Sequence, residues 1–220
     1  MIEAAGARRR EDTLRLASLR LAGGGGSAVL LAAGALAARA RHDHALTERL
    51  ARAAIAEGAG FDARYVAAEA AHAQGRPAQA ERELAALASE AASDADRARV
   101  ALLRFDNTYF LQGREADLRL IDEVADAVTE PFWRDELRTR RFFVMSLSRG
   151  PRATVEAASA LLQRSRSGPL APAYTALFYS LARLGRLDEA IQQLSPAPGS
   201  AAIPAPDEPW DRWTCLSPMS

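Results

Sequence analysis

Apolar positions recur every three to four residues through most of the chain, which is the period of a helix with one buried face. Short breaks of glycine, proline or polar residues separate these stretches. The pattern predicts a first helix over 8–21, followed by five helix pairs. The predicted pairs are 27–41 with 43–57, 61–74 with 77–91, 94–112 with 114–129, 131–149 with 152–166, and 170–184 with 187–194. The expected fold class is therefore all-α.

The breaks inside the pairs recur at a regular interval. They fall at positions 42, 75, 113, 150 and 185, which are 33, 38, 37 and 35 residues apart. This is the length of one helix-turn-helix unit of an α-solenoid. Four of the five positions hold glycine, which ends a helix at least cost by adopting a positive φ, and His42 takes the equivalent place upstream. Because one pair cannot bury its apolar face alone, we expect the pairs to stack into a superhelix like that of tetratricopeptide repeats.

The same pattern divides the chain into three parts. Residues 1–26 hold the first helix and a glycine-rich connector, and residues 27–194 form the predicted helical-repeat domain. Residues 195–220 hold six of the eleven prolines, so we predict that this tail is disordered. The alternative is that Trp210 and Trp213 pack against the last helix pair.

Composition removes several kinds of catalytic chemistry. All 28 basic residues are arginine, so no lysine is present for a Walker A loop or a Schiff base. The glycines at 23–26 are followed by Ser27, Ala28 and Val29 where a phosphate-binding loop requires Gly-Lys-Ser/Thr. We interpret them as a connector, with Ser27 capping the next helix. The expected protein is not an enzyme and has no cofactor.

Metal and membrane binding are not expected either. His42 and His44 are two positions apart at a turn, and no third ligand lies near them in the sequence. The longest apolar run, residues 28–38, is about half of the roughly 20 residues that a membrane-spanning helix needs. Cys215 is the single cysteine, which excludes a disulfide framework. A cytoplasmic location is expected.

Charge is balanced overall but divided along the chain. Residues 61–130 hold 14 acidic residues and 8 arginines, whereas residues 131–168 hold 3 acidic residues and 8 arginines. Two interpretations are open. The blocks steer a charged partner, or they attract consecutive repeats to one another.

The candidate partner contacts lie on the first helices of the predicted pairs. Arg140 and Arg141 interrupt an apolar stripe, where an unpaired charge is costly, so we predict that they contact a partner. The alternative is that they pair with acids of neighbouring repeats, such as Asp106 or Glu136. His72 and Asn107 are further candidates, since the first helices of the predicted pairs are expected to line one groove of the superhelix.

Three longer sequence segments resemble those of a known family. They are Arg8–Ala17, Leu46–Ala54 and Arg134–Arg138, read together with Gly-Arg-x-x-x-Ala turns such as Gly185–Ala190. Together they resemble the helical-repeat region of the large ATP-binding LuxR-family transcriptional regulators of actinobacteria. The resemblance covers roughly residues 8–194.

This resemblance implies a sensor and interaction segment that receives a protein partner or a small effector. Regulators of that family also carry an ATPase module and a LuxR-type DNA-binding helix pair, and neither has a counterpart in this sequence. We therefore expect a fragment of such a regulator, without direct binding of nucleic acid by this chain. The alternative is a free-standing repeat adaptor that binds a peptide or helix in its concave groove.

Overall fold

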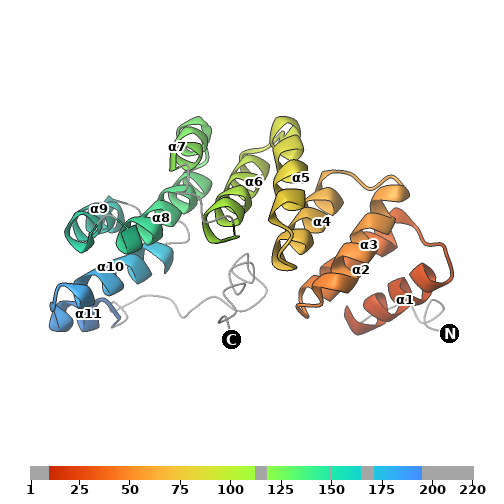
Figure 1. Ribbon diagram of the computed structural model, residues 1–220, viewed down its shortest axis with the longest axis horizontal. Coiled ribbons are helices and arrows are strands. Elements are labelled where there is room, and N and C mark those ends of the chain that lie inside the picture. Colours follow the sequence, from red (N-terminus) through yellow and green to blue (C-terminus); the bar gives the residue numbers. More distant parts are fainter. Residues whose placement is uncertain (1–9, 112–117, 149, 165–170, 195–220) are drawn as a thin grey trace. The chain divides into compact units, whose positions relative to one another are not determined.

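The computed structural model describes residues 10–111, 118–148, 150–164 and 171–194. Within these ranges all regular structure is helical, with eleven α-helices and one short π-helix (Figure 1). The predicted all-α class is confirmed. None of the described helices combines the length and the apolar character needed to cross a membrane.

The chain divides into two compact units, Met1–Asp117 and Leu118–Ser220. The boundary falls inside the predicted repeat domain 27–194, within the predicted helix 114–129. Each unit has its own buried apolar cluster.

In unit 1, consecutive helices pack against one another in chain order. They are α1 (Arg10–Ala22), α2 (Ala28–Arg39), α3 (His44–Ala56), α4 (Phe61–Ala73), α5 (Pro77–Glu90), α6 (Asp94–Asp106) and the π-helix η1 (Asn107–Leu111). Leu31, Leu50, Leu84 and Phe105 are among the largest fully or almost fully buried side chains. Many alanines share this core, so the helices approach closely.

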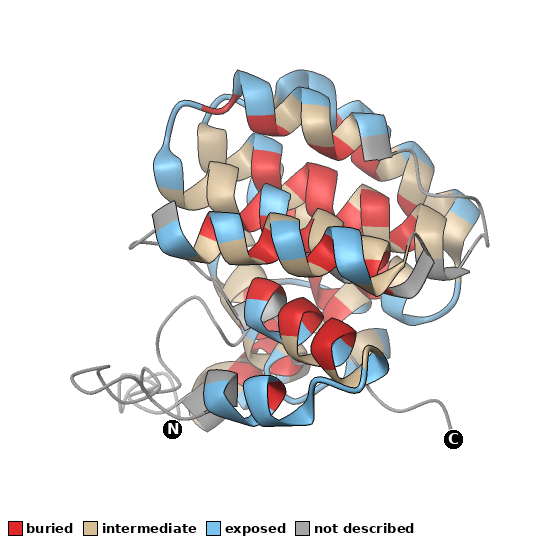
Figure 2. Ribbon diagram, turned by 90° about the vertical axis from the view of Figure 1, so that its left-hand side faces the viewer, coloured by how far each residue is buried: buried red, intermediate tan, exposed pale blue. Residues whose placement is uncertain are grey.

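Unit 2 is built in the same way from five further helices. They are α7 (Leu118–Ala127), α8 (Pro131–Ser148), α9 (Pro151–Arg164), α10 (Ala171–Arg183) and α11 (Leu187–Leu194). Ile121, Leu137 and Leu181 are buried where these helices meet. Proline begins α8 and α9, where the missing N–H leaves no helical hydrogen bond unmade. Figure 2 shows the buried residues concentrated on the inner helix faces.

Four of the five predicted turn positions have positive φ angles. The φ angles are 57° at His42, 70° at Gly75, 97° at Gly150 and 74° at Gly185. Position 113 lies outside the described residues. His42 is the one non-glycine residue with positive φ in the described part of the chain, so the upstream copy of the turn keeps the left-handed geometry without the glycine.

Other predictions hold in part. The Ser27 hydroxyl caps α2 by accepting a hydrogen bond from the Leu30 amide at 3.3 Å. The helix predicted over 94–112 stops at Asp106 and continues as the π-helix, so its hydrogen bonds change register at Asn107. The predictions for the tail 195–220 fall outside the described residues.

Candidate functional site

Two of the predicted contact residues meet in unit 1. His72 lies in the last turn of α4 and Asn107 begins η1, and the His72 Nδ1 and Asn107 Oδ1 atoms are 3.0 Å apart. Asn107 also donates from Nδ2 to the Pro77 carbonyl oxygen at 2.9 Å. One amide therefore links α4, the start of α5 and the end of α6.

This arrangement fixes the proton on His72. The Pro77 carbonyl only accepts hydrogen bonds, so the Asn107 amide nitrogen must face it. The Asn107 oxygen then faces His72, and Nδ1 of the imidazole must be the protonated, donating nitrogen.

Burial separates the roles of these two residues. Asn107 is fully buried, at 0% exposure, and both of its polar side-chain atoms are hydrogen-bonded inside unit 1. Both polar atoms are therefore used inside unit 1, and contact of Asn107 with a partner stays a prediction. His72 is half-buried.

The remaining two histidines lie at the turn between α2 and α3. The rings of His42 and His44 are 6.1 Å apart, centre to centre. Burial lowers the pKa of His44, and the nearby charges of His42 and His72 lower it further, against the opposite effect of Glu69 and Asp43. The three histidines of the chain therefore gather at one corner of unit 1, although 30 residues separate the turn from His72 in the sequence.

This corner does not form a metal site. Over the described ranges, no three histidine, cysteine or acidic side chains are placed to hold a metal ion. The lowered pKa of His44 means instead that the corner disfavours added protons.

A polar network beside this corner holds α3, α4 and α5 together. Glu48 on α3 accepts hydrogen bonds from Arg76 and, at 3.1 Å, from the Gln74 amide. Arg52 on α3 binds Glu83 on α5 at 2.6 Å. Burial raises the pKa of Glu48, but the hydrogen bonds from Arg76 and Gln74 outweigh it and keep the pKa below its ordinary value.

Ion pairs link different segments of unit 1, and five of the six named below use an acid from residues 61–130. They include Arg39–Glu69, Arg52–Glu83, Arg64–Glu90, Arg76–Glu48, Arg99–Asp62 and Arg104–Glu81. Five of them join two different helices of unit 1, and Arg76 acts from the N-cap position of α5. These pairs lie within unit 1, so both interpretations of the charge difference between residues 61–130 and 131–168 stay open.

The other two predicted contact residues lie side by side in unit 2, on α8. Arg140 is only 8% exposed and so lies mostly within the unit. Arg141 reaches the surface and binds Asp122 on α7, with 2.9 Å between the guanidinium nitrogen and the carboxylate oxygen. An acid of a neighbouring helix therefore does pair with Arg141, but it is neither of the acids suggested by the sequence.

Arg141 lines a pocket of about 370 Å³ between α7, α8 and α9, which we call the α7–α9 pocket. Its apolar lining comes from Ala125, Phe142 and Leu161. A second ion pair stands beside the first, between Arg138 and Asp126 at 3.6 Å. The pocket therefore combines an apolar surface with two pairs of opposite charges.

Sequence reasoning missed Arg138, Asp122 and Asp126, although a local signal was present. The two acids are four residues apart on α7 and the two arginines three apart on α8, so each pair shares one helix face. The helices meet at the short turn between Ala127 and Pro131, which makes the opposite charges face each other in reverse order.

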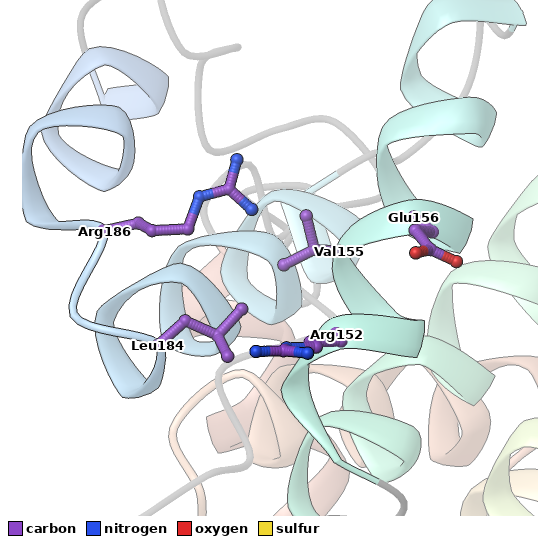
Figure 3. Close-up of a pocket in the computed structure, with 5 residues that line it drawn as sticks. All are labelled: Arg152, Val155, Glu156, Leu184 and Arg186. Atoms are coloured by element: carbon purple, nitrogen blue, oxygen red, sulfur yellow. The ribbon is translucent and has the colours of Figure 1, made fainter.

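A second pocket, of about 320 Å³, lies between α9 and the turn that joins α10 to α11, and we call it the α9–α11 pocket. Arg152, Val155 and Glu156 line it from α9, and Leu184 and Arg186 from the turn (Figure 3). Both pockets belong to unit 2, whereas His72 and Asn107 belong to unit 1.

Comparison of the chain with protein-family models, with curated proteins and with solved structures gives no match in any of the three.

Proposed function

We propose that the chain is a non-catalytic helical-repeat module, with its helix pairs stacked as in a tetratricopeptide-like superhelix. It binds a segment of a protein partner or a small effector in the α7–α9 pocket. The observation that carries this proposal is the apolar lining of Ala125, Phe142 and Leu161 beside the Arg141–Asp122 and Arg138–Asp126 pairs. Interfaces are commonly built in this way, with an apolar centre and a polar rim.

The ion pairs suit such a rim because they are weakly held. The side chains of Arg141 and Asp122 are 39% and 40% exposed, and Asp126 is more exposed still. Exposed ion pairs contribute only about 0–1 kcal/mol, so exchanging one for a pair with a ligand costs little. Meanwhile Asp122 holds the Arg141 guanidinium at the edge of the pocket before any ligand arrives.

The sequence resemblance supports the same function. The helical-repeat region of LuxR-family regulators receives effectors and partners, and we place this chain beside that region as a fragment of such a regulator. A free-standing adaptor that binds a peptide or helix is the alternative. An adjacent reading frame for an ATPase or DNA-binding module favours the regulator fragment.

The purified chain is expected to bind neither ATP nor duplex DNA with useful affinity. It has no lysine for a phosphate-binding loop. DNA binding needs concentrated basic charge. In the arginine-rich stretch 131–168, Arg141 pairs with Asp122 and Arg138 pairs with Asp126.

Selection from a library of random displayed peptides on the immobilised full chain tests the proposal. Amide chemical shifts of the ¹⁵N-labelled chain then locate the selected peptide. We expect saturable shifts in α7, α8 and α9, reduced by Arg141→Gln. A chain that selects no saturable binder, or binders that shift only unit 1, contradicts the proposal.

A matched control variant is available in Arg82→Gln. Arg82 is exposed on α5 of unit 1, so this change removes the same charge at another surface. If both variants weaken peptide binding equally, the peptide responds to the net charge of the chain and not to the α7–α9 pocket.

A further inference from the structure

The α9–α11 pocket shares no lining residue with the α7–α9 pocket and has a different charge pattern. In Figure 3, Arg186 extends from the α10–α11 turn towards α9, and Arg152 extends from α9 towards Leu184. Val155 lies between Arg186 and Glu156 in this view. Two guanidinium groups and one carboxylate thus surround two apolar side chains.

The two arginines are in different states. Arg186 binds Glu189 through two nitrogens, with Nε at 2.7 Å from one carboxylate oxygen and Nη2 at 2.6 Å from the other. Arg152 is exposed, and it makes no hydrogen bond or ion pair with any residue in the described part of the chain. The pocket therefore contains one guanidinium that already holds a side-chain carboxylate and another that is open to one.

We propose that the α9–α11 pocket binds an acidic side chain of a partner peptide, with a neighbouring apolar side chain packed on Val155 and Leu184. This inference rests on the proposed function, because it names the chemistry of the partner that the module binds. The partner carboxylate lies between Arg152 and Arg186, where charge-assisted hydrogen bonds from planar guanidinium groups are favourable. Glu156 then disfavours a second acid and favours a basic residue at the other end of the pocket.

The size of the pocket agrees with a short peptide segment. Its volume of about 320 Å³ is at the lower end of the roughly 300–1,000 Å³ of small-molecule sites. A pair of neighbouring side chains suits this volume better than a nucleotide-sized cofactor. Arg186 already binds a side-chain carboxylate, that of Glu189, which is the functional group proposed for the partner.

Fluorescence anisotropy with three labelled peptides tests the proposal on the full chain. The first probe is Ala-Ala-Glu-Leu-Ala-Arg with a C-terminal amide, the second has Gln in place of Glu, and the third has Gln and a free C-terminal carboxylate. We expect saturable binding of the first probe alone, and an increase of about tenfold in Kd for both Arg152→Gln and Arg186→Gln. The Arg82→Gln variant is expected to keep the Kd of the wild-type chain.

Each other outcome overturns the inference in a recognisable way. Binding of the third probe alone means that the pocket reads a chain terminus and not an acidic side chain. Binding of the first probe that responds to Arg141→Gln but not to Arg152→Gln or Arg186→Gln moves the acid to the α7–α9 pocket, which leaves the proposed function intact. Absence of binding by all three probes also overturns the inference. The displayed-peptide selection then decides separately whether the proposed function stands.

Because Arg152 and Arg186 are exposed, unchanged circular dichroism is expected to show that both variants fold.

Discussion

Replacing Asn107 by alanine is the most informative single perturbation of unit 1. The side chain is fully buried and is hydrogen-bonded to His72 on α4 and to the Pro77 carbonyl of α5. Asn107→Ala removes both hydrogen bonds and leaves empty space at the start of η1. We therefore expect a loss of stability that is concentrated in α4, α5 and η1.

The magnitude follows from the two contacts. A hydrogen bond inside a protein contributes about 0.5–1.5 kcal/mol net, so two of them contribute about 1–3 kcal/mol. The Pro77 carbonyl is in the first turn of α5 and His72 is only half-buried, so neither group is left as a fully buried orphan. We accordingly keep to this range for the free energy of opening, which corresponds to a change of about 5- to 150-fold in the opening equilibrium.

Hydrogen exchange measured by mass spectrometry is the appropriate assay, because it separates the two units. Unit 1 contains no tryptophan, because the three tryptophans of the chain are Trp133, Trp210 and Trp213, so peptide-resolved exchange is preferred to tryptophan fluorescence. Exchange in peptides from α4, α5 and η1 is expected to accelerate by about 5- to 150-fold under conditions where exchange follows opening.

Two further variants make the reasoning refutable. Arg82→Ala, an exposed change on α5, is expected to leave exchange nearly unchanged. His72→Ala removes one of the two hydrogen bonds, and a double-mutant cycle with Asn107→Ala is expected to show coupling. If Asn107→Ala behaves like Arg82→Ala, or if the two site variants are strictly additive, Asn107 does not link these helices.

Three other predictions concern the turns, the helix packing and the histidine corner. Because φ is 74° at Gly185, Gly185→Val is expected to lower the free energy of unfolding in urea by about 1 kcal/mol or more. Gly185→Asn is expected to lower it less. Equal stability of both variants contradicts the predicted turn at this position. A Cβ atom added at Gly34 would lie 2.3 Å from the Ala17 Cβ, so Gly34→Ala is expected to lower the free energy of unfolding by about 1–3 kcal/mol. Adding Ala17→Gly is expected to recover part of this loss, as measured by thermal unfolding. Burial and the nearby His42 lower the pKa of His44 in the folded chain below 6.5, so the unfolded chain binds more protons than the folded one. The free energy of unfolding is therefore expected to fall as the pH falls below 6.5. His44→Gln is expected to flatten the pH dependence of urea unfolding between pH 7 and 5.

The helices and their turns were predictable because their signals are local. Glycine at 75, 150 and 185 and proline at 77, 131 and 151 mark helix ends through their own backbone geometry. His42 was placed correctly although it lacks the glycine signal, since the spacing of the other turns located it. The π-helix at Asn107 has no comparable local signal; its first residue is hydrogen-bonded to His72 on α4 and to Pro77 of α5, which are distant in the sequence.

The partners of individual side chains were harder to predict. His72 and Asn107 were both selected from their helices, but their hydrogen bond joins residues 35 positions apart, and the sequence gives no rotation of one helix relative to the next. The same holds for Arg141: the alternative to a partner contact named Asp106 and Glu136 as possible acids, and the acid that pairs with it is Asp122. Charge composition left open whether the charges pair within the chain or contact a partner. Only packing decides which charges pair.

The central claim is that the α7–α9 pocket binds a partner segment, and the Kd of a selected peptide for the Arg141→Gln variant tests it most directly. Titration calorimetry of the full chain compares the wild type, Arg141→Gln and Arg82→Gln at low and high salt. We predict that Arg141→Gln raises the Kd by about tenfold or more, that Arg82→Gln leaves it unchanged, and that salt weakens wild-type binding. An equal Kd for all three proteins, or no saturable heat at millimolar peptide, contradicts the account.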